Sequence, residues 1–280
     1  MNINYLNFSN TTKFHEGKIP YFSSKKLDGI NGLYNAFSTK IGGISKAQFE
    51  SMNLSFTVGD EPSNVVENFH IFANNAKIPT DSMVYSHQTH TINVMKVGKD
   101  RGGMGIDRDR DFSNIDGIIT NEPEVCLVTS YADCVPLYIV DPVKRAIGLS
   151  HAGWRGTVNN IAKNTIELMI KEYGCNPADF QVFIGPSICA ECYEVSDDVA
   201  EEFAKAYGKD VFTDILIPKD NGKFKLNLHA ANKLNFIKKG VNADNIDITD
   251  VCTCCNSEIL FSHRATKGKR GGLCAFLMLK

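Results

Sequence analysis

Two histidines and one cysteine stand at the ends of predicted strands. His90 lies in a polar loop between two such strands, at 83–85 and 92–97. Cys134 follows an apolar strand at 125–130, and His151 comes directly after another strand, at 146–150. Neighbouring strands of one sheet lie ~5 Å apart, so side chains at their ends can meet at one point. Taken singly, each residue has an ordinary alternative, a buried thiol or a hydrogen-bonded imidazole.

Imidazole and thiolate are the ligands that a borderline-soft divalent ion prefers, and a set of one cysteine and two histidines leaves a fourth position for water or substrate. A water held there is acidified toward neutrality and becomes a nucleophile. We therefore predict a site for one transition-metal ion, zinc first and copper second, bound by His90, Cys134 and His151. Cys134 and His151 are then also catalytic candidates. Without a metal, the same two residues could act as a cysteine nucleophile and its base.

Two glycine-containing segments carry cations that could bind an anion. Gly153 and Gly156 flank Arg155 just before a predicted helix. Glycine there lets the backbone approach a ligand, and a helix N-terminus beside an arginine suits phosphate. Lys40 lies in the polar loop at 37–45, which holds a glycine pair. The alternatives are a tight turn that needs glycine for φ alone and a solvated lysine, but we take Arg155 and Lys40 as substrate-binding candidates.

Two polar residues adjoin the predicted ligands. Asp133 precedes Cys134 and is a candidate catalytic base, or a group that orients a ligand; its alternative role is a capping carboxylate. Gln88 lies two positions before His90 and is a substrate-binding candidate by its proximity alone.

Nine cysteines in a chain expected to stay in a reducing compartment favour thiols or metal ligands over disulfides. Five of them fall in two groups, Cys189-x-x-Cys192 and Cys252-x-Cys254-Cys255. Together these groups could form a four-thiolate structural zinc site. The second group, taken as Cys252-x-Cys254, is one residue short of the usual CxxC. Buried thiols are the alternative.

Short apolar strands and amphipathic helices must position these residues. Strands at 125–130, 136–140 and 146–150 are nearly continuous in apolar residues, as expected for strands buried on both faces. Further strands are predicted at 33–40, 181–184 and 275–279, and helices at 62–76 (capped by Ser63), 157–173 (ended by Gly174), 195–207 and 228–240. The irregular order of helices and strands favours an α+β sandwich of mixed β-sheets covered by helices, with residues 1–280 as a single domain.

Composition argues against two broad classes of partner. The chain has 280 residues, with 30 Lys plus Arg against 32 Asp plus Glu and a formal charge of −2. Binding to nucleic acid or to a membrane surface would need a basic surplus. No apolar run reaches the roughly 18–20 residues needed to cross a bilayer, and residues 1–14 lack a signal-peptide pattern. We expect a cytoplasmic protein.

Eight segments resemble those of the laccase-domain family, also called the multicopper polyphenol oxidoreductase or purine nucleoside phosphorylase family. They are FSTKIGGIS (37–45), MNLSFTVGD (52–60), HQTH (87–90), DGIIT (116–120), ADCVP (132–136), SHAGWRG (150–156), GPSI (185–188) and CYEV (192–195). The resemblance implies an α+β domain in which His90, Cys134 and His151 bind the metal. It also implies phosphate-dependent cleavage of adenosine, inosine, guanosine and methylthioadenosine, with adenosine deamination, so that the partners are purine nucleosides and phosphate.

Some members of this family are described as peptidoglycan-editing factors that remove serine from a muramyl precursor, and others as copper-dependent phenol oxidases. Both activities are alternatives here, as is a metal-stabilised protein that only binds a partner. With seven histidines we find ligands for one copper, whereas multicopper oxidation needs several. Two departures from the family pattern stand out. Lys40 replaces the usual arginine and loses its bidentate fork, and Ala265 replaces the second arginine of the FSYRR segment.

Overall fold

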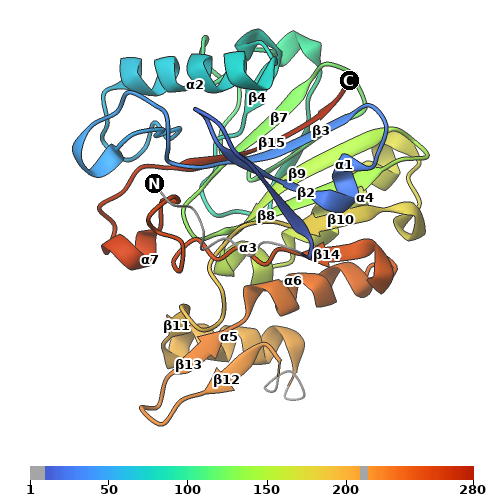
Figure 1. Cartoon of the computed structure of the whole chain (residues 1–280). Helices are drawn as coiled ribbons and strands as arrows, with labels where there is room; N and C mark the ends of the chain where they lie inside the picture. The colour runs from blue at the N-terminus through green and yellow to red at the C-terminus, as the bar shows by residue number, and fades with distance from the viewer. Residues whose placement is uncertain (1–9, 209–213) are drawn as a thin grey trace.

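The computed structural model describes residues 10–208 and 214–280, and two six-stranded sheets dominate it (Figure 1). The first sheet has the order β1 (Thr12–His15), β2 (Tyr21–Ser24), β3 (Leu33–Ser38), β15 (Leu273–Leu279), β7 (Cys126–Tyr131) and β4 (Met83–Tyr85). The second has the order β14 (Ile246–Ile248), β10 (Gln181–Ile184), β8 (Val135–Asp141), β9 (Ala146–Ala152), β6 (Gly117–Thr120) and β5 (Val94–Lys96). Both sheets are mixed, because the pairs β4–β7, β5–β6 and β10–β14 are parallel and the other pairs are antiparallel.

The central strands of both sheets are buried on their two faces. In β15, Leu273 and Ala275 face the core between the sheets, whereas Cys274 and Phe276 face the opposite side. Strand β8 alternates in the same way between the core that separates the sheets and the outer core of the second sheet. Because side chains alternate along a strand and both faces are covered, these strands read as nearly continuous apolar runs.

Helices cover the outer face of each sheet. Helix α2 (Pro62–Ala76) packs Val65, Phe69 and Phe72 onto the first sheet. Helices α4 (Ile161–Tyr173) and α6 (Leu228–Ile237) cover the second sheet. A small sheet of β11 (Glu194–Val195), β13 (Phe224–Leu226) and β12 (Leu216–Pro218) projects at one end together with α5 (Asp197–Tyr207) (Figure 1). Short helices α1 (Lys25–Asp28), α3 (Trp154–Val158) and α7 (His263–Thr266) lie in the connections. The expected α+β sandwich of mixed sheets is confirmed.

Most predicted elements are confirmed within a few residues, but two local predictions are wrong. The helix expected over 157–173 is broken into α3 and α4, because Asn160 adopts a left-handed φ of 62° and its side chain caps α4 by accepting from the Lys163 amide. Ser63 does not cap α2, because the helix already begins at Pro62, whose fixed φ and missing N–H suit the first helical position. Gly174, with φ of 65°, ends α4 as predicted.

The sequence pattern does not predict β1, β2, β6 or β11 to β14. These strands have two to four residues each, which is too few for an alternation of apolar and polar residues to be recognised.

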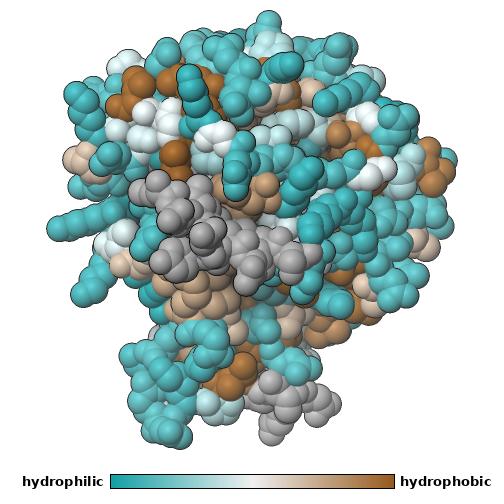
Figure 2. Space-filling model, viewed as in Figure 1, coloured by the Kyte–Doolittle hydropathy of each residue, from teal (hydrophilic) through white to brown (hydrophobic). Residues whose placement is uncertain are grey.

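The visible surface is mainly hydrophilic, with separate hydrophobic residues scattered over it (Figure 2). Ile44, Val143, Ile170 and Ile237 are the large hydrophobic residues that stand exposed in the described part of the chain. None of the helices described has the length and apolar character needed to cross a membrane.

Candidate metal centre

The three predicted metal ligands converge on one point. The donor atoms of His90, Cys134 and His151 all lie within 4.8 Å of one another, and the two imidazole rings meet edge to face with centroids 4.9 Å apart. Strand pairing explains this proximity: β8 pairs antiparallel with β9, and Pro136 lies opposite His151, so Cys134 just before β8 lies beside the end of β9. A tetrahedral ion with bonds of ~2.0–2.3 Å holds its donors roughly 3.3–3.8 Å apart, so these residues fit zinc or copper.

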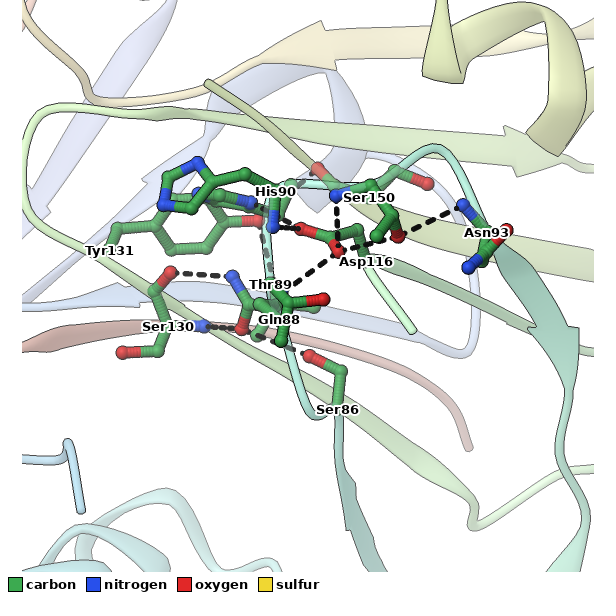
Figure 3. A network of polar contacts seen from close by, with 12 residues as sticks. Ser86, Gln88, Thr89, His90, Asn93, Asp116, Ser130, Tyr131 and Ser150 are labelled. Atoms are coloured by element: carbon green, nitrogen blue, oxygen red, sulfur yellow. Dashed lines mark hydrogen bonds and ion pairs between the residues drawn. The ribbon is translucent and has the colours of Figure 1, made fainter. Parts of the chain in front are cut away.

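Asp116 organises the ligands, although the sequence reasoning did not select it. This carboxylate, fully buried just before β6, accepts hydrogen bonds from the backbone amides of Thr89, His90 and Thr91 at 2.9–3.0 Å (Figure 3). It also accepts from the Thr91 hydroxyl at 2.8 Å and lies 2.8 Å from Nδ1 of His151. The three amides can point at one carboxylate because His90 takes a left-handed φ of 63°. The available signal was Asp116 itself, an acidic residue entering an apolar strand within the DGIIT segment.

The bond from His151 to Asp116 leaves Nε2 of that ring as the nitrogen available to a metal, the usual arrangement of a metal-binding histidine. Burial raises the pKa of Asp116, but the bonds from His151 and from the Thr89 and Thr91 amides outweigh it and lower the pKa to about 2. Burial, followed by the neighbouring His151, lowers the pKa of His90 and favours its neutral, ligating form. Asp116 therefore stays ionised at neutral pH, orients the ring of His151 and fixes the backbone of His90.

Gly153 permits the close packing of the ligands. A Cβ at this position would lie 2.9 Å from Nδ1 of His90 and 3.1 Å from Sγ of Cys134. Its φ of −68° and ψ of 179° are open to any residue, so the need for glycine is steric and not conformational. Of the two explanations for this glycine, close approach of the backbone is the one that the geometry supports.

Two cavities meet at the metal ligands. One, of about 150 Å³, is lined by polar groups that include Gln88, Arg110 and Ser130, and the other, of about 340 Å³, by Tyr193 and Arg264 among others. His90, Ala132, Cys134 and Arg270 border both cavities. Nε of Arg270 is buried and has no hydrogen-bond partner among the described residues. A guanidinium that borders both cavities beside a metal centre is suited to bind an anionic or strongly polar group of a ligand.

Asp133 and Gln88 border the cavities but are held by the protein. Asp133, with φ of 86°, accepts from the Thr253 hydroxyl at 2.6 Å on one oxygen and from the Arg264 amide at 2.7 Å on the other. The Gln88 amide donates to the Ser130 carbonyl at 2.8 Å and accepts from the Ser130 amide at 2.7 Å (Figure 3). Both side chains therefore connect the walls of the site.

The structure separates the two cations that were expected to bind an anion. Arg155 borders the larger cavity, and its guanidinium stacks on Trp154 at 4.2 Å from the ring centroid. Lys40 lines neither cavity, and its ammonium donates to the Ser257 carbonyl at 2.7 Å. The helix that begins beside the metal ligands is α3, which has only five residues. Its short dipole adds little to anion binding, so the side chains must supply most of it.

The similarity of this chain to known proteins extends over all the residues of the metal centre. A family model described as multi-copper polyphenol oxidoreductase laccase matches residues 34–280, which include all three ligands. The purine nucleoside phosphorylase YlmD of Bacillus subtilis is 35% identical over 246 residues, 87% of each chain. Adenosine deaminase RL5, from an unknown prokaryotic organism, is 32% identical over 86% of this chain and 90% of its own. The crystal structure of YlmD from Geobacillus stearothermophilus gives a TM-score of 0.88 at 32% identity and covers 95% of this chain and 98% of that one.

Proposed function

The chain belongs to the multi-copper polyphenol oxidoreductase laccase family, and from this membership we propose that it is a metal-dependent purine nucleoside phosphorylase that also deaminates adenosine. The observation that carries the proposal is the position of the His90–Cys134–His151 cluster, between two cavities that are both bordered by Arg270. A site of this kind can hold a neutral nucleoside and an anionic co-substrate together.

We assign zinc to the cluster, with copper as the second choice. A bound ion would supply Lewis acidity, which polarises a substrate oxygen and acidifies water, the chemistry that deamination of adenosine requires. His90, Cys134 and His151 would hold it. Asp116 would orient the His151 ring through Nδ1 and fix the backbone of His90 through its amide. We also propose that the protein works in the cytoplasm, where Cys134 stays reduced, and that residues 1–280 form one domain.

Phosphorolysis places an oxygen of phosphate on C1′ of the ribose, breaks the bond from C1′ to the purine nitrogen, and leaves an electron pair on the base, which takes up a proton. We propose that Arg270 and Arg155, both bordering the larger cavity, bind the phosphate and hold it near C1′. They take over the role that the sequence suggested for Lys40, whose ammonium is engaged by Ser257.

The larger cavity has room for the nucleoside. Its aromatic lining, Tyr193 and Trp154, offers flat surfaces against which a purine can stack. Asp133 is our candidate for the group that protonates the leaving base. Because both of its oxygens accept hydrogen bonds in this structure, the bond to Thr253 or Arg264 must open first. Asp133 can then take up a proton from solvent and transfer it to the base. Gln88 is held against Ser130 and presents its remaining surface to the smaller cavity.

The test is to incubate zinc-loaded protein with adenosine, with and without phosphate, and to separate the products by liquid chromatography. We expect adenine and ribose 1-phosphate only when phosphate is present, and inosine in both cases. His90→Ala should abolish both phosphorolysis and deamination because it removes a metal ligand. His70→Ala, at a half-exposed histidine of α2 that is paired with Asp107 2.8 Å away, is the matched control and should change neither. A zinc-loaded protein that releases no base in response to phosphate would refute phosphorolysis.

A further inference from the structure

Four cysteines outside the metal centre also meet at one point. The sulfurs of Cys189, Cys192, Cys252 and Cys255 all lie within 4.8 Å of one another. The first two lie in the segment after β10 and the last two in the segment after β14. Strands β10 and β14 are parallel neighbours, so the chain leaves both at the same edge of the second sheet. The topology therefore brings together two segments about sixty residues apart in the sequence, as in the pair Cys192 and Cys255.

The spacing within each pair is that of a zinc site. Cys189 and Cys192 are separated by two residues, and so are Cys252 and Cys255. Grouping Cys254 with Cys252 had made the second pair one residue short, but the structure brings in Cys255 instead and leaves Cys254 out of the cluster. Two such pairs on adjoining loops are the usual donors of a closed four-thiolate zinc site.

The distances suit an ion and do not fit a disulfide. Sγ of Cys255 lies 3.4 Å from that of Cys192 and 4.0 Å from that of Cys189. Four sulfurs at ~2.3 Å from a tetrahedral zinc lie about 3.8 Å apart, whereas the two sulfurs of a disulfide lie ~2.0 Å apart. The backbone amides of Cys189 and Cys255 also donate to Sγ of Cys252 at 3.3 and 3.4 Å, which stabilises negative charge on that sulfur.

We propose that Cys189, Cys192, Cys252 and Cys255 bind a second zinc ion, structural in role and separate from the His90–Cys134–His151 centre. Cys252 is buried and Cys255 is exposed, so the ion has a path to the site from solvent. Four thiolates fill the coordination shell of zinc and leave no position for substrate. The ion would therefore stabilise the fold and take no part in the reaction.

The proposed ion would hold one wall of the larger cavity. The two segments that carry the cysteines already run side by side, joined by a bond from the Thr253 amide to the Ser187 carbonyl at 3.1 Å. Thr253 donates its hydroxyl to Asp133, and Arg264 donates to the carbonyl of Cys192 at 3.2 Å. Loss of the ion would free both segments, and with them the positions of Asp133 and Arg264 beside the catalytic centre.

The experiment measures zinc in full-length protein purified in reducing buffer without chelator, by mass spectrometry of the element. The double variant Cys189→Ser/Cys192→Ser keeps only two thiolates and should lose one equivalent of zinc per chain relative to the wild type. Cys254→Ser, a partly exposed neighbour outside the cluster, is the matched control and should lose none. His90→Ala should lose only the other equivalent. The two sites, and therefore this proposal and the proposed activity, can thus fail independently of each other.

If the double variant does not fold, the wild type itself provides a second measurement. Titration of its thiols with an organomercurial, while a chromogenic chelator reports free zinc, should release one equivalent of zinc as four further thiols react. Unchanged zinc content in a folded double variant would overturn the proposal. So would zinc release that is complete before these thiols react, or a bond between Cys192 and Cys255 in peptides mapped without reduction.

Discussion

Replacing Asp116 by asparagine keeps the size of the side chain but turns one of its two acceptor oxygens into a donor. In the native protein, Oδ1 accepts from the His90 amide and faces Nδ1 of His151, while Oδ2 accepts from the amides of Thr89 and Thr91 and from the Thr91 hydroxyl. Whichever way the new amide turns, its NH₂ group must face at least two of these donors. The variant therefore leaves at least two donors, buried or partly buried, without an acceptor.

The free-energy cost of Asp116→Asn follows from the number of donors left without an acceptor. Each buried donor left unsatisfied costs about 1–3 kcal/mol, so the loop that carries His90 and the ring of His151 together lose roughly 2–6 kcal/mol of positioning free energy. Loss of a group that orients metal ligands typically weakens metal binding 10–100-fold, which corresponds to about 1.4–2.7 kcal/mol. We expect zinc affinity at the His90–Cys134–His151 centre to fall about 10–100-fold. The remainder of the cost should appear as lower thermal stability of the variant.

The assay is competition for zinc between the protein and a fluorescent chelator, combined with thermal unfolding of each variant. Asp141→Asn is the matched control, because Asp141 is equally buried and accepts two backbone amides, from Val143 and Lys144, on a single oxygen that asparagine retains. It should leave zinc affinity unchanged. If Asp116→Asn binds zinc within twofold of the wild type, the argument that Asp116 orients the ligands is wrong.

Three further predictions test other parts of the site and the fold. Gly153→Ala should fold normally but bind zinc at least ~10-fold more weakly, because its Cβ would lie 2.9 Å from His90 Nδ1 and 3.1 Å from Cys134 Sγ; unchanged affinity in the same chelator assay would contradict this. Arg270→Gln removes a charged donor worth about 1.5–3 kcal/mol, so the KM for phosphate should rise roughly 10–100-fold, and deamination, which uses no phosphate, should change much less. Burial lowers the pKa of His229 to about 4, below the ordinary value of about 6.5, so the unfolded chain binds more protons between these values. The corresponding free energy of unfolding, on the order of 3 kcal/mol, is fully present above pH 6.5 and is lost as the pH falls to 4. His229→Asn should flatten the pH dependence of the free energy of unfolding, measured with urea. An identical slope in the variant would refute this assignment to His229.

Local patterns in the sequence determined the elements and the types of ligand. Apolar runs such as 136–140 predict strands buried on both faces, because each side chain of such a strand meets a covered surface. His90, Cys134 and His151 could be selected because they end or follow these runs, and strand ends are the places where side chains from separate segments can meet. The irregular order of strands and helices, without regular βαβ alternation, was enough to indicate an α+β sandwich.

Tertiary structure alone decided which residues complete each site. Asp116 binds His151 and the His90 loop only because β6 pairs with β9, and Arg270 reaches both cavities although it lies far from the ligands in sequence. The choice of Cys255 over Cys254 depends on how two loops leave parallel strands. Patterns in a sequence report which face a residue turns within its own element. Contacts between elements depend on pairing and register, which are set by the packing of the whole core.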